Sequence, residues 1–260
     1  MKNTHQNIPI IILSGGKGER FVSKVNLPKQ LAKVSSHPII MEIILYYSKN
    51  GFNFFILPLG YRSNFFIKFF NDIKNIKKYN LNIIKNNKID VIKSKINILL
   101  FDAGHKANKL MRIKKSIKYL DDKNSQFGVC YGDIFANIAF KKELLYFQKK
   151  NIEAIAVGYN EHSPFGHVKV KNGLVTNFYE KPKLPDPINI GFYFFNKKIF
   201  LNIHNKLGED LETSLLPKLS KMNKLGCYIH RGYHFTVNSQ KDLIEVKQIY
   251  KKNKNFFINL

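Results

Sequence analysis

A short apolar segment that leads straight into a glycine-rich loop limits the folds open to this chain. Residues 8–13 are apolar and mostly β-branched, which is typical of a buried parallel strand. The strand end and the loop contain Leu13, Ser14, Gly15, Gly16 and Gly18. Glycine has no Cβ, so the backbone can approach a ligand closely, and a loop after a strand presents N–H groups to an anion. The segment predicts a nucleoside triphosphate site at the start of the chain.

Basic residues close to the loop support this prediction. Arg20 carries a planar fork of donors that matches phosphate, and Pro28 and Lys29 follow shortly after. The loop lacks the G-K-[ST] ending of a P-loop and does not fit G-x-G-x-x-G. By itself, Gly-Gly-x-Gly is also the pattern of a tight turn. The preceding strand and the two cations together favour the binding site.

Strand and helix patterns alternate through the first part of the chain. Strands are expected at 8–13, 54–59, 96–101, 127–131 and 154–159, and helices at 38–49, 64–73, 107–120 and 141–150. The lysine-rich segment 74–95 has no clean period, and we expect it to be a solvated, poorly ordered face. The alternation predicts an α/β fold with a doubly wound, mostly parallel sheet. Ligands of such sheets bind beyond the carboxyl ends of the strands.

The second part of the chain has a different character. Asn172-Gly173 lies between two short strands at 168–175 and predicts a hairpin. Further strands are expected at 188–195 and 225–230, and helices at 210–221 and 240–250, where Pro217 kinks the first helix or sets its end. We find no repeat or linker. We therefore expect a single domain, 1–260, with a small β-rich insertion: a nucleotide-binding half at 8–160, a sugar-phosphate-binding half at 161–250 and a tail at 251–260.

Charge and cysteine content restrict the partners. The formal net charge of +25 suggests a polyanion, but the lysines are spread along the chain and no nucleic-acid-binding motif appears, so nucleic acid is the minority interpretation. No apolar stretch reaches the roughly 20 residues of a membrane span, and no signal peptide is evident. Cys130 and Cys227 lie in apolar runs and are expected to be small buried residues. A cytoplasmic protein without a membrane partner is the natural expectation.

Acidic and amide residues follow later strands. Gly132 and Asp133 end the strand at 127–131, where a carboxylate that faces a phosphate loop suits Mg²⁺; a helix cap or turn is the alternative. Glu180-Lys181-Pro182 places a point charge after the hairpin, although an ordinary exposed turn explains this tripeptide better when it is taken alone. Asn189 and Gly191 put a polar side chain and a glycine within a strand, which suits close approach of a ligand.

Taken in order, these motifs resemble the sugar-1-phosphate nucleotidyltransferase family, most of all its glucose-1-phosphate cytidylyltransferase branch. The resemblance covers nearly the whole chain. The residues that carry it are Leu13-Ser14-Gly15-Gly16-x-Gly18-x-Arg20, Pro28-Lys29-x-Leu31, Gly60-Tyr61, Asp102-x-Gly104, Tyr131-Gly132-Asp133, Phe165-Gly166, Glu180-Lys181-Pro182, Asn189-x-Gly191-Phe192 and Glu212.

The resemblance implies transfer of NMP, with CMP favoured, from an NTP to a sugar 1-phosphate or a similar phosphate-bearing metabolite. The products are an NDP-sugar, for surface polysaccharide synthesis, and pyrophosphate. Mg²⁺ is the implied cofactor, and a homo-oligomer is an open option. The resemblance implies that the nucleotide is bound by Leu13, Ser14, Gly15, Gly16, Gly18 and Gly132. Arg20 and Lys29 would neutralise the phosphates, and Asp133 would bind the metal. Lys181 would bind the sugar phosphate, and the sugar would be bound by Glu180, Asn189, Gly191 and Glu212.

The sequence departs from the family pattern in three segments. The best register puts Asn238, and a shifted register Thr236, where the family has a second metal-binding Asp. Asn offers an oxygen to a metal but no charge. Leu110 and Met111 replace small residues near the base, where we expect them to crowd it, and Glu19 brings negative charge into the loop. The alternative function is therefore a nucleotide-binding homologue with reduced or lost catalysis.

Overall fold

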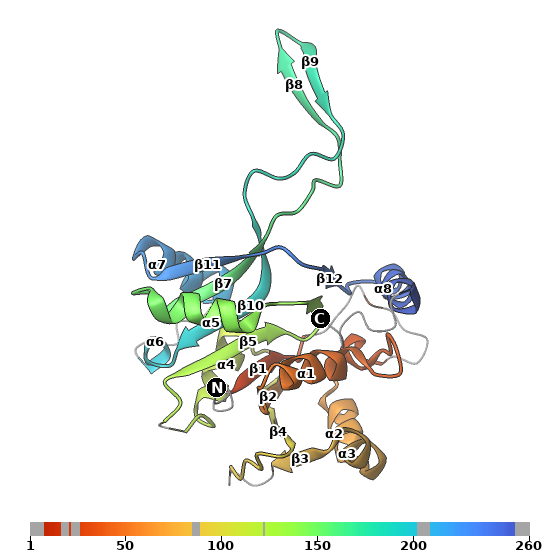
Figure 1. Ribbon diagram of the computed structural model, residues 1–260, viewed down its shortest axis with the longest axis vertical. Coiled ribbons are helices and arrows are strands. Elements are labelled where there is room, and N and C mark those ends of the chain that lie inside the picture. The colour runs from red at the N-terminus through yellow and green to blue at the C-terminus, as the bar shows by residue number, and fades with distance from the viewer. Residues whose placement is uncertain are drawn as a thin grey trace.

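The computed structural model describes residues 8–16, 21, 27–84, 89–121, 123–201 and 209–252. Its centre is a sheet of eight strands in the order β11-β7-β10-β5-β1-β2-β4-β3 (Figure 1). All neighbouring strands are parallel except β10, which is antiparallel to both β5 and β7. The strands are β1 Ile10–Leu13, β2 Phe54–Leu59, β3 Leu81–Ile84, β4 Ile96–Asp102, β5 Gln126–Tyr131, β7 Ala154–Tyr159, β10 Ile188–Asn196 and β11 Leu225–His230.

Helices cover both faces of the sheet, and strand periodicity explains why. Successive side chains of a strand point to opposite faces. In β1, Ile10 and Ile12 belong to one buried apolar cluster, whereas Ile11 and Leu13 belong to the other. The first cluster contains side chains of α1 Ile39–Lys49, α2 Ser63–Asn71, α3 Ile73–Tyr79, α5 Phe140–Lys149 and α8 Gln240–Lys252. The second contains side chains of α4 Lys109–Ile117, α6 Lys198–Leu201, η2 Leu211–Leu215 and α7 Leu216–Lys221.

The strand order reverses between β1 and β5. From β1 the chain continues to β2 on one side, and later returns to β5 on the other. Leu13 lies opposite Tyr131 in the register of these two parallel strands, so their carboxyl ends meet at the same edge. In open α/β sheets, the point where the order reverses leaves a crevice for a ligand. The fold therefore brings the glycine-rich loop beside Asp133.

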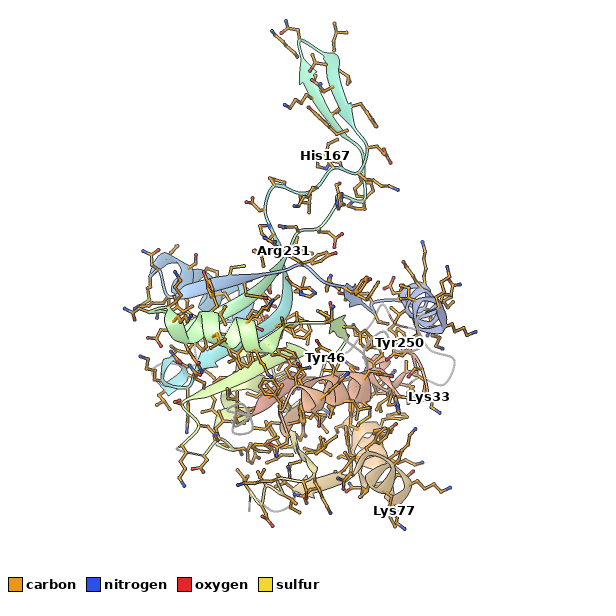
Figure 2. The ribbon with its side chains drawn as sticks, viewed as in Figure 1. Lys33, Tyr46, Lys77, His167, Arg231 and Tyr250 are labelled. Atoms are coloured by element: carbon orange, nitrogen blue, oxygen red, sulfur yellow. The ribbon has the colours of Figure 1, made fainter. Side chains whose placement is uncertain are left out.

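Two small antiparallel sheets complete the structure. In one, β6 Ile134–Ala136 pairs with β12 His234–Thr236 directly after β5. In the other, β8 His167–Lys171 pairs with β9 Leu174–Tyr179, and every residue of both strands is exposed. Figure 1 shows this hairpin standing well away from the body. Figure 2 places His167 on the projection, beyond Arg231 at its base. We call residues 161–187 the arm.

The expected α/β fold is confirmed, but the expectation of poor order was wrong for residues 74–84 of the lysine-rich segment. Residues 73–79 form α3, with Asp72 as its cap, and Leu81–Ile84 form an edge strand. Tyr79 and Leu81 are buried, so this lysine-rich surface has an apolar underside. The helix expected at 64–73 also ends at Asn71, where Asp72 begins the next one.

Cys130 is buried as expected, but the prediction for Cys227 was wrong. Cys227 is exposed, because its strand, β11, lies at the edge of the sheet. The helix expected at 210–221 is a π-helical turn, η2, followed by α7, with Pro217 in the first turn of α7. A proline within a helix removes one regular α-helical hydrogen bond, and here the turn directly before it is π-helical, which departs from that bonding pattern. Within the described ranges, none of the helices combines the length and apolarity that a bilayer span requires.

Candidate active site

A cavity of about 740 Å³ opens at the carboxyl ends of β1 and β5, and we call it the switch-point cavity. Its wall is formed by residues of the glycine-rich loop, of the 3-10 helix η1 Lys29–Leu31, of the start of α4 and of the segment after β12. Its lining residues are Leu13, Gly15, Gly16, Lys29, Gln30, Ala107, Asn108, Lys109, Arg112, Tyr131, Asp133, Asp210 and Asn238.

Lys29 and Asp133 form an ion pair in this cavity. The Lys29 Nζ atom contacts Asp133 Oδ2, and the side chains are 12% and 19% exposed. A charge taken out of water is costly unless an opposite charge compensates it. The two opposite charges therefore compensate each other at the cavity wall. The site offers one ammonium group and one carboxylate to the same incoming ligand.

The side chain of Arg112 fixes the glycine-rich loop through hydrogen bonds to backbone carbonyls. Its guanidinium donates to the carbonyls of Pro58, Leu59, Gly15 and Gly104 at 3.0, 2.8, 2.9 and 3.2 Å. Burial lowers the pKa of Arg112, while nearby Asp102 opposes that shift. These bonds link the ends of β1, β2 and β4, and they use the guanidinium of Arg112 for hydrogen bonds within the protein.

Glycine is required at two positions because the guanidinium of Arg112 lies so close. A Cβ added to Gly15 would lie 1.9 Å from Arg112 Nη1, and one added to Gly60 would lie 2.5 Å from Nη2. A Cβ on Gly16 would meet no atom of the described residues within 4 Å, and Gly16 is exposed. The loop backbone at Gly16 is therefore accessible to a ligand while Gly15 is fixed against the protein.

Ser14 and Gly132 support the loop without lining the cavity. Ser14 is 1% exposed, and its hydroxyl donates to the carbonyl of Ile12 at 3.4 Å. A Cβ on Gly132 would lie 2.6 Å from the Ser14 oxygen. These two residues let β1 and β5 end close together, which sets the width of the crevice.

Asn238 reaches the same cavity through the small β6–β12 sheet. Thr236 pairs with Ile134, and the amide of Val237 donates to the carbonyl of Asp133 at 3.0 Å. Asn238 therefore lies beside Asp133, and both line the cavity. Thr236 is not among the lining residues; its hydroxyl lies 3.3 Å from His234 Nε2. Of the two registers that the sequence allowed, the one with Asn238 brings a polar side chain to the cavity.

A polar network borders the cavity on the side of Tyr131. The Tyr131 hydroxyl donates to Glu212, whose Oε1 also lies 2.9 Å from Lys109 Nζ. The second oxygen of Glu212 is buried without a hydrogen-bond partner among the described residues. Burial raises the pKa of Tyr131 well above its usual range, so the phenol stays protonated and acts as a donor.

Asn189 and Gly191 join this network from β10. The Asn189 amide donates to the Tyr193 hydroxyl at 2.5 Å, and that oxygen lies 3.3 Å from the Tyr131 hydroxyl. Burial raises the pKa of Tyr193 to about 12. A Cβ on Gly191 would lie 2.5 Å from the Tyr131 ring, so the close approach predicted for Gly191 is made by a tyrosine side chain.

The structure gathers six of the predicted site residues around one cavity and leaves others apart. Gly15, Gly16, Lys29, Asp133 and Asn238 line one cavity together with Leu13, and Glu212 contacts its wall. Glu180 and Lys181 do not line it; both are exposed in the arm, directly after β9. Gly18, Glu19 and Arg20 lie outside the described residues.

Several lining residues were missed by sequence reasoning, and one expectation was wrong. Arg112 lies on the buried face of α4 next to Ile113, where sequence alone favours an exposed position. Asp210 was not recognised because it resembles an ordinary helix cap, which it also is, accepting from the amide of Leu211 at 2.8 Å. Leu110 and Met111 were expected to crowd a base. Leu110 is buried in the apolar core, and neither residue lines the cavity.

The fold and the cavity define an α/β protein with a polar cavity where its strand order reverses. The family model described as "Nucleotidyl transferase" matches residues 10–253, and the chain therefore belongs to the nucleotidyl transferase family.

Individual relatives agree with this assignment. The probable glucose-1-phosphate cytidylyltransferase of Bacillus subtilis is 29% identical over 249 residues, which are 94% of this chain and 96% of the relative. The glucose-1-phosphate cytidylyltransferase of Salmonella typhimurium is 24% identical over 253 residues, again 94% and 96% of the two chains. The fold is similar to that of HddC from Yersinia pseudotuberculosis complexed with GMP-PN, with a TM-score of 0.63 and 19% identity over 94% of this chain and 99% of that one.

Proposed function

We propose that this protein transfers a nucleoside monophosphate from an NTP to a sugar 1-phosphate, with CTP as the favoured donor. The products are an NDP-sugar, for surface polysaccharide synthesis, and pyrophosphate. Family membership and the two relatives named as glucose-1-phosphate cytidylyltransferases support the reaction class. The observation that carries the proposal is the meeting of Gly16, Lys29 and Asp133 in one cavity at the switch point.

The proposed chemistry is an in-line displacement. An oxygen of the sugar phosphate attacks the α-phosphorus of the NTP, and the bond from that phosphorus to the bridging oxygen breaks, so pyrophosphate leaves with the bonding electrons. The exposed loop backbone at Gly16 and the ammonium of Lys29 stabilise the negative charge on the phosphates, and Arg20 is proposed to do the same. Positioning and charge stabilisation account for the rate, because no covalent nucleophile is needed.

The donor set of the cavity suits a divalent cation. The carboxylate of Asp133 and the amide oxygen of Asn238 are hard oxygen ligands, and Mg²⁺ typically takes one or two carboxylates and completes its shell with phosphate and water. We propose that these two residues hold Mg²⁺, which when bound would neutralise phosphate charge. Lys29 then contacts phosphate in place of Asp133.

The sugar is proposed to bind beside Tyr131. Glu212 has an unpartnered buried oxygen there, which suits a sugar hydroxyl, and Asn189 orients the tyrosine pair that borders it. Glu180 and Lys181 remain proposed contacts of the sugar and its phosphate. Both lie on the arm, outside the cavity, and we propose that the arm of a second copy brings them to it.

Pyrophosphate release over a matrix of CTP, UTP, GTP, ATP and dTTP against several sugar 1-phosphates tests the proposal. We expect turnover with at least one pair, and a loss of at least about 100-fold in Asp133→Asn, since that change removes the metal-binding charge. Asp90→Asn, an exposed position away from the cavity, is the matched control and keeps full activity. The proposal is contradicted if no pair of substrates releases pyrophosphate, or if Asp133→Asn keeps full activity.

A nucleotide-binding homologue with reduced or lost catalysis is the second candidate. The placement of Asn238, a neutral residue, beside Asp133 favours it. Under this alternative, calorimetry shows nucleotide binding without turnover, and Asn238→Asp raises the rate because it restores a second carboxylate. An unchanged rate in Asn238→Asp would show that charge at this position does not limit the reaction.

A further inference from the structure

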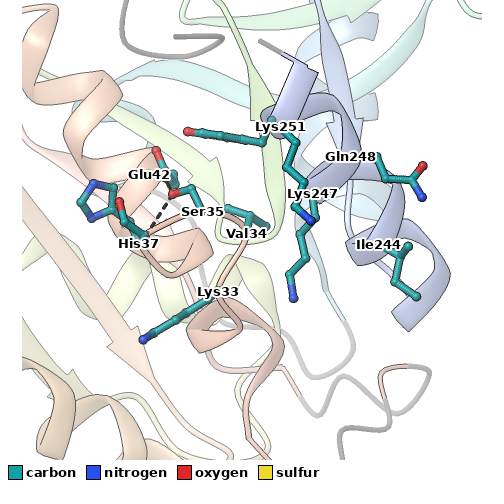
Figure 3. A pocket seen from close by; sticks show the side chains of 11 residues that line it. Lys33, Val34, Ser35, His37, Glu42, Ile244, Lys247, Gln248 and Lys251 are labelled. Atoms are coloured by element: carbon teal, nitrogen blue, oxygen red, sulfur yellow. Dashed lines mark hydrogen bonds between the residues drawn. The ribbon is translucent and has the colours of Figure 1, made fainter. Parts of the chain in front are cut away.

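Two cavities of similar volume differ in the polar groups that they leave open to a ligand. One, of about 830 Å³, lies between the loop that precedes α1 and the helix α8 (Figure 3). Its buried carboxylate, Glu42, accepts from the hydroxyl of Ser35, and the Lys33 ammonium is directed away from α8. The other is the switch-point cavity, whose wall includes Lys109 and Asp210. Neither of these two residues has a role in the proposed transfer of the monophosphate.

Lys109 is the first residue of α4, directly after the residue that caps this helix, Asn108. The Lys109 side chain is 39% exposed, whereas that of Lys29 is 12% exposed. Arg112 is buried and uses its guanidinium on four backbone carbonyls. Of the described cations that line the switch-point cavity, Lys109 is therefore the most open to a ligand.

The ammonium group of Lys109 has donors that the protein does not use. It lies 2.9 Å from Glu212 Oε1 and 5.4 Å from the centroid of the Tyr131 ring. Asp210 Oδ2 is 4.0 Å away, which is too far for a direct hydrogen bond. An ammonium group has three donors, and among the described residues Glu212 is the one that accepts from it. At least one donor of Lys109 is therefore available to a ligand.

Asp210 has an unused acceptor on the same part of the wall. Its Oδ1 atom accepts from the amides of Leu211 and Leu110 at 2.8 and 3.3 Å, which fixes the carboxylate. No described residue donates a hydrogen bond to Oδ2, although the side chain is only 29% exposed. A partly buried carboxylate oxygen is stabilised by a donor, so a ligand with a donor is favoured at Oδ2.

The gap of 4.0 Å between Lys109 Nζ and Asp210 Oδ2 suits a single hydroxyl group. Polar atoms at this separation are often bridged by a group that bonds to both of them. A hydroxyl can bridge them because its oxygen accepts one hydrogen bond while its hydrogen is donated in another. A phosphate dianion cannot donate to Asp210, and an ammonium group cannot accept from Lys109. The two side chains together therefore select a neutral hydroxyl.

We propose that Lys109 and Asp210 are specificity-determining residues that together bind one hydroxyl of the acceptor sugar. Lys109 contacts Glu212 and lies over the Tyr131 ring, where the sugar is proposed to bind, which assigns the hydroxyl to the sugar rather than to the NTP. This inference rests on the proposed nucleotidyltransferase function. The binding of a sugar phosphate can nevertheless be measured without turnover.

Isothermal titration calorimetry with glucose 1-phosphate and its 2-, 3-, 4- and 6-deoxy analogues tests this contact. We expect the native chain to bind one analogue at least about tenfold more weakly than glucose 1-phosphate, because the missing hydroxyl leaves a charged donor and a charged acceptor unpaired. In Lys109→Met/Asp210→Ser, the same analogue should bind within about twofold of glucose 1-phosphate, since nothing is left to recognise the hydroxyl. Lys106→Met, which changes an exposed lysine outside the cavity, is the matched control and keeps the native discrimination.

Lys109→Met alone leaves the cap that Asp210 provides intact, and it should also reduce the discrimination, so a double variant that fails to fold does not end the test. The contact is overturned if the native chain does not bind glucose 1-phosphate, if it binds all four analogues equally well, or if Lys109→Met keeps the native discrimination. Pyrophosphate release measured in parallel separates this contact from the proposed function. Discrimination that depends on Lys109 in a chain without turnover supports the contact and contradicts the reaction, whereas turnover with discrimination that is independent of Lys109 does the reverse.

Discussion

Single buried polar residues determine the shape of the switch-point cavity. Arg112 bonds four carbonyls from three strand ends and fills the space that Cβ atoms at Gly15 and Gly60 would occupy. A guanidinium has five donors in one plane, whereas an ammonium is a single point charge. We therefore regard Arg112 as a positioning residue, which acts on the ligand through the glycine-rich loop.

Arg112→Lys should preserve the positive charge but lose the arrangement of donors that bonds the four carbonyls. One ammonium group cannot reach all four carbonyls, and a carbonyl left buried without a partner costs free energy. We expect a fall of roughly 1–3 kcal/mol in the free energy of unfolding, measured with urea. We also expect weaker NTP binding. Native stability together with native affinity in Arg112→Lys would contradict this role.

Glu143 predicts a pH dependence of stability. It lies fully buried on the apolar face of α5, and neither oxygen has a hydrogen-bond partner among the described residues. Burial raises its pKa from 4.5 to about 8. Between these values the folded chain holds a proton that the unfolded chain releases, so this group makes the fold less stable as pH rises from about 5 to 8.

Urea unfolding of the native chain and Glu143→Gln at pH 5, 6.5 and 8 measures this effect. Glutamine does not titrate, so the variant should lose less stability over that interval, by up to roughly 1 kcal/mol per pH unit. The comparison cancels the groups that both chains share. Identical slopes would show that Glu143 does not hold a proton in the folded chain.

At the scale of the element, an irregularity in β10 shapes the side of the cavity at Tyr131. The register of β10 with β7 shifts between Asn189 and Tyr193, and Gly191 within this bulge has φ +72°. Bulges re-aim side chains and accept glycine in the left-handed region. Here the bulge lets the Tyr131 ring lie against the Gly191 backbone, where it reaches Glu212.

Gly191→Ala should therefore be costly in two ways. Its Cβ would strain the backbone and displace the Tyr131 ring, so we expect a loss of about 1–3 kcal/mol in the free energy of unfolding. Gly173→Ala is the matched control, because Gly173 also has positive φ, +80°, but a Cβ there meets none of the described residues within 4 Å. If both variants lose equal stability, the contact with Tyr131 contributes nothing.

At the scale of the whole molecule, the arm presents apolar side chains to solvent. Phe165, Leu174 and Phe178 are 73%, 73% and 65% exposed. A lone two-stranded hairpin is marginally stable in water, and exposed apolar patches usually mark an interface. The arm also carries Glu180 and Lys181. A second copy of the chain would cover the patch and bring these two residues to a cavity.

Leu174→Glu/Phe178→Glu tests this assembly. We expect the native chain to elute as an oligomer in size exclusion with light scattering, and the double variant to shift toward the monomer, because charge opposes burial of the patch. Circular dichroism checks that the body stays folded. If the native chain is monomeric at tens of micromolar, a second copy does not supply Glu180 and Lys181 to the proposed sugar site.

The sequence predicted best the features that depend on neighbours along the chain. The loop at Gly15 and Gly16 and the carboxylate of Asp133 were recognised because each directly follows an apolar strand, and parallel strands end at one edge. The hairpin was recognised from Asn172-Gly173, whose φ values are both positive as its turn requires. Asn238 followed from the resemblance to the family.

Features that depend on tertiary contacts could not be predicted from the sequence. Nothing local distinguishes the buried Arg112 from an exposed arginine, because its partners lie on three other strands and loops. β6 and β12 have three residues each, too few to show a period, and only their pairing defines them. The direction of the arm and the surroundings of Leu110 are likewise set by packing.

The most direct test of the central claim is a crystal structure of the native chain with CTP and Mn²⁺, which replaces Mg²⁺ and scatters anomalously. The account predicts a Mn²⁺ peak in contact with Asp133 and Asn238, and the triphosphate against the loop backbone at Gly16 and the ammonium of Lys29. A nucleotide or a metal ion bound elsewhere, with the ion pair between Lys29 and Asp133 intact, would contradict it.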